Sequence, residues 1–249
     1  MVEGGENFRR ATSVSTASRH VVYSRVRRPD ASLALRASKL PVSDIYEALP
    51  DRAAVLMSPR MRPVIAGKRI AGPAVTAQSA AGDNLMMHKA LLLAEAGDVL
   101  VVAAAEPAGA QWGSLAAVYA RHKGLAGVVV HGPVRDIEDI VANDFPVWST
   151  SISPAHPEKQ AAGSVNAPIE CDGVVVRPGD IVCADDDGVV VIPRDSAAEV
   201  IAKAEQRVVK EKEITAAILR GETLFDLHDI ASEFARSGVR EIDAVWDDG

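Results

Sequence analysis

The sequence predicts an α/β fold built around one main domain. From about residue 40, segments with helical spacing alternate with extended segments, which is the pattern of an α/β protein. Two of the extended segments, Asp98–Ala105 and Ala126–Gly132, are almost continuous runs of apolar residues rich in valine. Runs without polar alternation are typical of strands covered on both faces, as in a parallel sheet. We therefore expect a sheet with buried, parallel strands.

The expected helices begin at capping residues and end at glycines. Ser43 or Asp44 can cap the first helix, and Asp83 or Asn84 can cap the second. Glycines supply the stop signals at the other ends. The predicted helices are Pro41–Leu49, a segment from residue 84 to Gly97, residues 114–123 before Gly124, a short helix from Asp136, and Ser196–Leu219 before Gly221.

Further extended segments lie between these helices. Ile70–Thr76 and Pro146–Thr150 are expected to be strands. Ile169–Pro193 combines β-branched runs with three turn signals, which is typical of antiparallel hairpins. The turn signals are Cys171-Asp-Gly173, Pro178-Gly-Asp180 and Asp185-Asp-Asp-Gly188.

One core domain with terminal appendages is expected, because no repeat, linker or shift in composition divides the chain. The predicted parts are a basic N-terminal arm over residues 1–38, an α/β core domain over 39–222 and a C-terminal helical extension over 223–249. Residues 7–29 contain six arginines and no acidic residue. This composition predicts a solvated basic arm or one that lies on a neighbouring subunit. A transit peptide is the alternative, which Glu3 and Glu6 disfavour.

Composition and charge exclude several classes of protein. The 249 residues are 48% hydrophobic and 24% charged, which is typical of a globular chain. A net charge of −7 and only 4% aromatic residues argue against nucleic acid as a partner. No apolar run is long enough for a membrane span, and Cys171 and Cys183 form no metal or disulfide motif. We expect a cytoplasmic protein with neither a nucleic-acid nor a membrane partner.

The most informative residues are the adjacent Arg135 and Asp136, which follow the strand Ala126–Gly132. Open α/β sheets bind ligands at the carboxyl ends of their strands. Arginine can hold a carboxylate through two hydrogen bonds, and an aspartate oxygen can hold a hard cation. The structural alternative is that Asp136 caps the following helix and pairs with Arg135. Gly113 favours the ligand site, because the amides after it begin a helix N-terminus directed at the same ligand.

Several further motifs accompany this pair. They are Gly82-Asp-Asn84 with His88, Gly97-Asp-Val-Leu-Val-Val102, Gly113-x-Leu115, Gly127-Val-Val-Val-x-Gly132, Gly163-Ser-Val-Asn166, Pro178-Gly-Asp180 and Ala184-Asp-Asp-Asp-Gly-Val189. Together with Arg135-Asp136 they resemble the class II pyruvate aldolases over roughly residues 40–235. That family includes the 4-hydroxy-4-methyl-2-oxoglutarate and 4-carboxy-4-hydroxy-2-oxoadipate aldolases. It shares its fold with the regulator of ribonuclease E activity A (RraA).

The resemblance implies a fold, an assembly and a cofactor. The fold is a swivelling β/β/α domain, with mixed sheets and flanking helices. The assembly is a homotrimer or homohexamer with active sites between subunits. The cofactor is Mg²⁺, or alternatively Mn²⁺ or Co²⁺, held mainly through waters by Asp136. Glu211, on the longest helix of a neighbouring subunit, reaches the water shell of this metal.

The resemblance also implies how substrate is bound, with one departure from the family pattern. Arg135 binds the pyruvyl carboxylate or ketone, and the backbone amides around Gly113, Ser114 and Leu115 complete the pocket. The aldolases carry an aspartate in this loop, twenty residues ahead of the Arg-Asp pair, where this chain has Ser114. A serine hydroxyl is no base near neutral pH without an activating partner. The loss weakens retro-aldol cleavage, which needs a base, more than decarboxylation, which does not.

Other candidate residues have structural alternatives. His88, on the helix after the Gly82-Asp-Asn84 motif, either faces the pocket or packs against the domain. For His131, within a predicted buried strand, a core role is favoured over catalysis. The acidic run Asp185–Asp187 lacks the alternating ligands of a calcium loop and is better explained as a hairpin turn. Nucleotide cofactors are not indicated, because no glycine-rich phosphate loop is found.

We therefore expect a divalent-metal-dependent carbon–carbon lyase that cleaves a small 2-oxo acid through a pyruvate enolate. The reaction is that of a 4-hydroxy-4-methyl-2-oxoglutarate-type aldolase, an oxaloacetate decarboxylase, or both. The predicted catalytic residues are Arg135, Asp136 and Glu211, with Asp136 as the metal ligand. The alternative is a non-catalytic RraA-like regulator that binds a partner protein.

Overall fold

The computed structural model describes residues 20–52, 54–104 and 108–246. The chain divides into two compact units between Glu205 and Gln206, within the longest helix. The first unit holds the sheets and the helices around them. The second holds the end of the long helix and two short helices. The predicted domain boundaries after residues 38 and 222 stay predictions.

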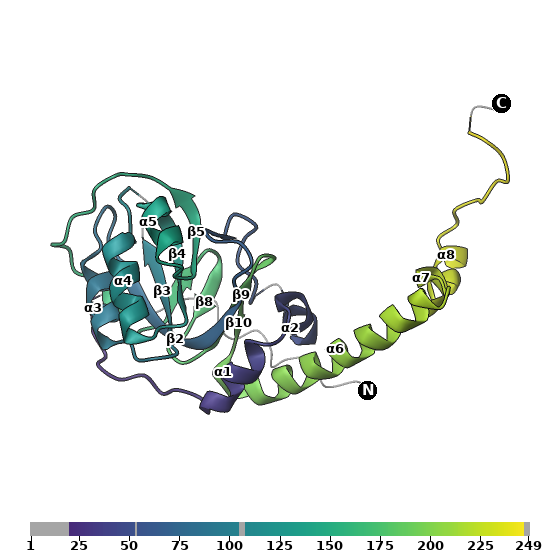
Figure 1. The fold of residues 1–249 in the computed structure, drawn as a ribbon, viewed down its shortest axis with the longest axis horizontal. Coiled ribbons are helices and arrows are strands. Elements are labelled where there is room, and N and C mark those ends of the chain that lie inside the picture. Colours follow the sequence, from purple (N-terminus) through teal and green to yellow (C-terminus); the bar gives the residue numbers. More distant parts are fainter. Residues whose placement is uncertain (1–19, 53, 105–107, 247–249) are drawn as a thin grey trace, which may run out of the picture. The chain divides into compact units, whose positions relative to one another are not determined.

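The first unit is organised around a mixed sheet (Figure 1). Its strands follow the order β1-β5-β4-β3-β2-β9-β10, and β6 pairs with β2 off this path. Strands β7 and β8 form a separate two-stranded sheet. The strands are β1 (Arg62–Pro63), β2 (Ile70–Ser79), β3 (Val99–Ala104), β4 (Gly127–Val134), β5 (Val147–Ile152), β6 (Ser164–Val165), β7 (Ile169–Cys171), β8 (Val174–Val176), β9 (Ile181–Asp185) and β10 (Gly188–Ile192).

The centre of the sheet is parallel, as the valine runs predicted. Strands β2, β3, β4 and β5 pair with one another in parallel. Strand β9 joins β2 antiparallel, and β10 pairs with β9 across the predicted turn before Gly188. The hairpin of β7 and β8 turns at the predicted Asp172–Gly173. The expected α/β class, with a mixed sheet and flanking helices, is confirmed.

The helices follow the predicted order, with one addition near the N-terminus. They are α1 (Ala31–Ala37), α2 (Val42–Ala48), α3 (Leu85–Leu93), α4 (Ser114–Lys123), α5 (Ile137–Ala142), α6 (Ala197–Leu219), α7 (Leu224–Leu227) and α8 (Ile230–Arg236), with a 3₁₀ turn at Arg194–Ser196. Within the described ranges, no helix combines the length and apolar composition that crossing a bilayer requires.

Two helix ends differ from the sequence prediction. The N-cap of α2 is Pro41 rather than Ser43 or Asp44, and the Asp185 carboxylate accepts a hydrogen bond from the Val42 N–H at 3.0 Å. A carboxylate distant in sequence therefore does the capping. Helix α3 ends before Gly97, at Leu93, because Ala94 is already extended with ψ 150°. Helix α4 ends as predicted, at a left-handed Gly124.

Both faces of the parallel strands are buried. Neighbouring residues along each strand point to opposite faces, so side chains on both sides of the sheet are buried. One face packs against α3, α4 and α5, which lie together on one side of the sheet (Figure 1). The other face packs against the β7–β8 hairpin and residues of β9 and β10. On β3, Leu100 and Val102 belong to the first cluster, whereas Val99 and Val101 belong to the second. The continuous valine pattern follows from this double coverage.

The basic segment before the core is held to the core at two points within residues 20–38, although Arg25 and Arg27 are exposed. The Arg28 guanidinium donates two hydrogen bonds, of 2.9 and 2.7 Å, to the carboxylate of Asp98, whose side chain is 1% exposed. The Tyr23 N–H donates to the Val165 carbonyl, which places the segment along β6. The composition predicted exposed arginines, and Arg25 and Arg27 are exposed. Arg28 differs because it pairs with a buried acid. Residues 1–19 lie outside the described part of the chain.

The Arg28–Asp98 pair generates a stability prediction. Replacing Arg28 with alanine leaves the buried Asp98 carboxylate without its cation, so we expect a loss of about 3 kcal/mol in the free energy of unfolding. The exposed Arg25 offers a matched control, and Arg25→Ala is expected to change stability by less than about 0.5 kcal/mol. Urea denaturation of both variants measures the difference. Equal losses would contradict the structural role of the pair.

Candidate functional site

The site lies where β4 ends and α4 begins. Strand β4 ends at Val134, and Arg135 and Asp136 follow directly. Trp112 forms a parallel bridge with Val134, and the Arg135 N–H donates to the Trp112 carbonyl at 3.0 Å. The start of α4 is therefore held against the carboxyl end of β4. This is the sheet edge at which α/β folds bind ligands.

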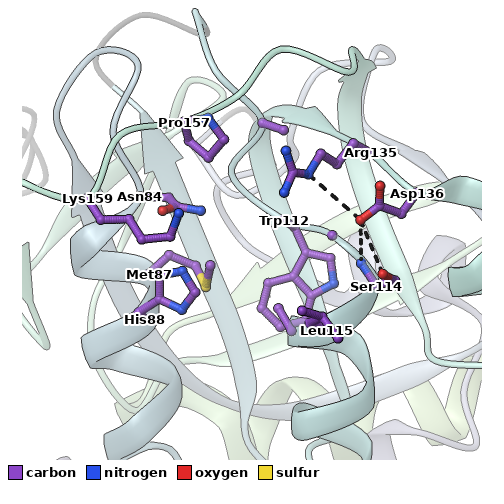
Figure 2. Close-up of a pocket in the computed structure, with 13 residues that line it drawn as sticks. Asn84, Met87, His88, Trp112, Ser114, Leu115, Arg135, Asp136, Pro157 and Lys159 are labelled. Carbon is purple, nitrogen blue, oxygen red and sulfur yellow. Dashed lines mark hydrogen bonds and ion pairs between the residues drawn. The ribbon is translucent and has the colours of Figure 1, made fainter.

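Asp136 is turned toward α4 rather than toward its own helix. Its backbone is left-handed, with φ 60° and ψ 44°, and it occupies the N-cap position of α5 without a side-chain cap bond. Its Oδ2 instead accepts hydrogen bonds from the Ser114 N–H at 3.1 Å and the Ser114 hydroxyl at 3.2 Å (Figure 2). Arg135 Nε lies 3.7 Å from the same oxygen. Carboxylate, helix N-terminus and guanidinium thus meet at one point.

The close approach of Asp136 depends on Gly113. A Cβ atom at position 113 would lie 2.7 Å from Asp136 Oδ2 and 3.4 Å from Arg135 Nε. The backbone of Gly113 is extended, with φ −157°, so any residue could adopt its conformation. Glycine is needed here for space. The motif that suggested a ligand-binding turn therefore acts by admitting a carboxylate to the helix N-terminus.

These residues line a pocket of about 240 Å³. On one side lie Ser114, Arg135 and Asp136; across the pocket lie Lys159 and His88 (Figure 2). Helix α3 supplies further residues to that opposite side, and the loop after β5 supplies Lys159. The described residues that line it are Asn84, Met87, His88, Ala110, Trp112, Gly113, Ser114, Leu115, Ala116, Arg135, Asp136, Pro157 and Lys159.

The charges of the lining favour an anionic ligand. Arg135 and Lys159 bring a cation to each side, and the single carboxylate among the described lining residues, that of Asp136, already faces Arg135. Burial lowers the pKa of His88, Lys159 lowers it further, and Asp83 opposes both. The His88 imidazole is therefore neutral near pH 7, where it can accept a proton or a hydrogen bond.

The donor set fits a divalent ion held mostly by water. Asp136 offers a hard oxygen donor, and its side chain is 37% exposed. In the described part of the chain, no group of three or more His, Cys, Asp or Glu side chains is placed to hold a metal. Mg²⁺ keeps several waters and needs only one or two carboxylates. The residues present therefore fit a water-held ion on Asp136, and they do not fit an ion ligated wholly by protein side chains.

The structure brings most of the predicted site residues together. Gly113, Ser114, Leu115, Arg135 and Asp136 all line the same pocket. Their catalytic, substrate-binding and metal-binding roles stay predictions. Glu211 is exposed on α6 in the second unit, and its role also stays a prediction.

The remaining candidates divide between the pocket and the scaffold. His88 lines the pocket, which was one of its two predicted positions. His131 does not line it, because its Nδ1 accepts a hydrogen bond from the Asp172 N–H at 3.0 Å, in the β7–β8 hairpin. Asp185 ends β9 and its Oδ1 accepts from the Asp187 N–H, so the acidic run is a hairpin turn, as expected.

Sequence reasoning missed Lys159. It lies in an irregular loop between β5 and β6 and belongs to no motif that was recognised. The available signal was topological, since loops after neighbouring parallel strands gather at one edge of a sheet. Trp112 was missed as well, because its indole lies beside the pocket only once the loop before α4 is folded.

A comparison with protein families agrees with this arrangement. A family model described as RraA-like, Aldolase/RraA, matches residues 41–191, more than half of the chain. The chain belongs to the Aldolase/RraA family. The predicted resemblance is confirmed at this level.

Two curated relatives and one solved structure are similar to this family member. A Halalkalibacterium halodurans protein, provisionally named 4-hydroxy-4-methyl-2-oxoglutarate aldolase, is 36% identical over 167 residues, 67% of this chain and 77% of that protein. A Burkholderia multivorans protein with the same provisional name is 34% identical over 155 residues, 60% and 93% of the two chains. A solved Streptomyces coelicolor structure, described as an unusual member of the RNase ES inhibitor RraA protein family, has a TM-score of 0.68 and 29% identity, covering 77% of this chain and 99% of that one.

The fit of Asp136 against Gly113 generates a geometric prediction. In Gly113→Ala, we expect the Asp136 carboxylate to move away from the Ser114 N–H, because the new methyl group would occupy its position. A crystal structure of the variant measures the shift directly. Ser114→Ala is the control, since it removes the hydroxyl but keeps the backbone N–H that holds Oδ2. An unmoved Asp136 in Gly113→Ala would contradict the steric account.

Proposed function

We propose that this Aldolase/RraA family member is a divalent-metal-dependent carbon–carbon lyase for small 2-oxo acids. The proposed reaction releases pyruvate from oxaloacetate, from a 4-hydroxy-2-oxo acid such as 4-hydroxy-4-methyl-2-oxoglutarate, or from both. The observation that carries the proposal is the convergence of Arg135, Asp136 and the α4 N-terminus on one pocket with a second cation, Lys159, across it. The relatives provisionally named aldolases support the same class of reaction.

The chain itself supplies the binding groups for a 2-oxo acid. The Arg135 guanidinium can grip the substrate carboxylate through two hydrogen bonds. The N–H groups of Leu115 and Ala116, in the first turn of α4, have no partner within a helix and favour negative charge. The Lys159 ammonium would hold the second carboxylate of a dicarboxylic substrate. This assignment favours dicarboxylic over monocarboxylic 2-oxo acids.

Asp136 would hold the metal, and Arg135 would neutralise charge that grows during bond cleavage. A bound Mg²⁺, Mn²⁺ or Co²⁺ would polarise the substrate ketone and accept electron density as the C3–C4 bond breaks. Arg135 can stabilise the same developing charge, because its guanidinium lies beside the pocket, with Nε 3.7 Å from Asp136 Oδ2. Glu211, from a neighbouring subunit of a proposed trimer or hexamer, would assist proton transfer to the pyruvate carbon.

Ser114 makes decarboxylation the simpler of the two proposed reactions. Its hydroxyl donates to Asp136 Oδ2, so it is engaged as a hydrogen-bond donor. Retro-aldol cleavage also needs a base to remove the proton of the C4 hydroxyl, whereas decarboxylation of oxaloacetate does not. Among the described lining residues, the neutral His88 imidazole is the side chain besides Asp136 that can take up this proton.

The proposal predicts that Arg135 and Asp136 are essential. In Arg135→Ala and Asp136→Asn, we expect kcat/KM for pyruvate release to fall at least about 100-fold, because each removes a charge that acts on the reacting atoms. The assay couples pyruvate formation from each substrate to a dehydrogenase, with Mg²⁺ and with chelator. Glu138→Gln, an exposed acid on α5 outside the pocket, is the matched control.

Two results would overturn the lyase proposal. One is that the wild-type protein turns over neither substrate with Mg²⁺, Mn²⁺ or Co²⁺. The other is full activity in both variants. The first outcome would favour the second candidate, a protein-binding regulator, which the likeness to a solved member of the RNase ES inhibitor family suggests. The second outcome would exclude Arg135 and Asp136 as the catalytic residues of the proposed reaction.

The position of Lys159 predicts substrate selection. In Lys159→Met, we expect KM for oxaloacetate to rise about 10-fold, equivalent to about 1.4 kcal/mol of lost binding, with a smaller change in kcat. Binding of pyruvate, which has one carboxylate, should change less than 2-fold. Calorimetry and steady-state kinetics measure the two effects. An equal loss for both ligands would exclude a specific role for Lys159 at the second carboxylate.

A further inference from the structure

Asp83 is a buried acid next to the pocket that the proposed reaction does not use. The residue is 2% exposed and lies between β2 and α3. Its Oδ1 accepts a hydrogen bond from the Leu85 N–H at 2.7 Å, which caps the first turn of α3. Its Oδ2 accepts two more, from the Gln160 N–H at 2.6 Å and the Ala161 N–H at 2.9 Å. One carboxylate therefore joins a helix N-terminus to a loop about 77 residues further along the chain.

Backbone hydrogen bonds fix the same loop on the other side of Lys159. The Asn84 N–H donates to the Glu158 carbonyl at 3.0 Å, and the Glu158 N–H donates to the Gly82 carbonyl at 2.8 Å. Lys159 thus lies between two anchored residues. Glu158, before it, is hydrogen-bonded to the backbone on either side of Asp83, and Gln160, after it, is hydrogen-bonded to the Asp83 carboxylate. The loop is anchored immediately before and immediately after the residue that faces the pocket.

The charge of Asp83 strengthens this anchor. Burial alone would raise the pKa of the carboxyl group, but the three backbone N–H donors and the nearby Lys159 outweigh burial. The net pKa lies below the usual value for aspartate, so the carboxylate is charged at neutral pH. Hydrogen bonds to an ionised acceptor are about twice as strong as neutral ones. The interaction is therefore lost only as the pH falls through this lowered pKa.

We propose that Asp83 is a positioning residue that sets Lys159 and the α3 side of the pocket at the correct distance from Arg135. The three bonds of one carboxylate fix both elements that carry the far side of the pocket, the α3 helix with His88 and the loop with Lys159 (Figure 2). Asp83 itself is not among the residues that line the pocket. The kinetic tests of this inference rest on the proposed function, because that function assigns Lys159 to the second carboxylate of the substrate.

The decisive variant is Asp83→Asn in the full-length protein. The amide keeps the shape but cannot accept hydrogen bonds at both ends, so one segment must lose its anchor. We expect KM for oxaloacetate to rise about 10-fold, with less than about a 3-fold change in kcat and no change in pyruvate binding. In a Lys159→Met background, Asp83→Asn should raise KM no further, because the group that it positions is already gone.

A matched control separates positioning from general stability. Asp180 is also buried, at 4% exposure, and accepts hydrogen bonds from two backbone N–H groups, those of Arg177 and Arg194. It does not line the pocket. Asp180→Asn should therefore lower the melting temperature without changing KM. If Asp83→Asn does not fold, Asp83→Glu keeps the charge but displaces the oxygens by one methylene, and it should raise KM in the same way.

Hydrogen exchange tests the anchor independently of catalysis. In Asp83→Asn, either the amide of Leu85 or those of Gln160 and Ala161 should exchange at least about 10-fold faster, because the one remaining acceptor oxygen can serve only one side, while the amides of β3 stay protected. Unchanged exchange at all three amides, or additive KM effects with Lys159→Met, would overturn the proposal. If the wild-type protein turned over neither substrate, the proposed lyase function would be wrong. The exchange experiment would still decide whether Asp83 fixes the loop.

Discussion

The site depends on one contact, the approach of the Asp136 carboxylate to the N-terminus of α4. Three local features make it possible: a left-handed backbone at Asp136, a glycine at 113 that leaves room for Oδ2, and the Ser114 N–H at 3.1 Å. A negative charge at a helix N-terminus is favourable, and the neighbouring Arg135 compensates it further. The contact therefore fixes both charged groups without burying either, and it leaves them 35% and 37% exposed at the pocket.

Two aspartates perform related tasks on the two sides of the pocket. Asp136 joins β4 to the start of α4, and Asp83 joins the start of α3 to the loop that carries Lys159. Their difference lies in exposure. Asp83 is 2% exposed and has three backbone N–H partners, so its bonding capacity is largely used within the protein. Asp136 is accessible, which suits a group that meets substrate or metal.

Local sequence signals predicted the parallel strands, most helix ends and five of the residues that line the pocket, Asp136 among them. Valine runs indicate strands buried on both faces, and Gly124 indicates a helix end in the left-handed conformation. Neither prediction requires knowledge of distant residues. Contacts between segments far apart in sequence escaped prediction. Asp185 caps α2 across 143 positions, and Arg28 is drawn to Asp98 across 70. Lys159 lies in a loop that Asp83, 77 positions before Gln160, holds by hydrogen bonds.

The serine at position 114 changes the chemistry of the proposed site more than its shape. An aspartate there would place a second carboxylate beside Asp136, and two acids in contact raise the pKa of one of them. That arrangement provides a group able to hold or release a proton. With Ser114, both the hydroxyl and the N–H donate to Asp136 Oδ2, so the Asp136 charge is stabilised and no second acid is present at that position. The proposed site therefore suits a reaction that needs a held cation and a positioned carboxylate, as decarboxylation does. Among the described residues, the base for retro-aldol cleavage would come from the opposite side of the pocket, where His88 lies.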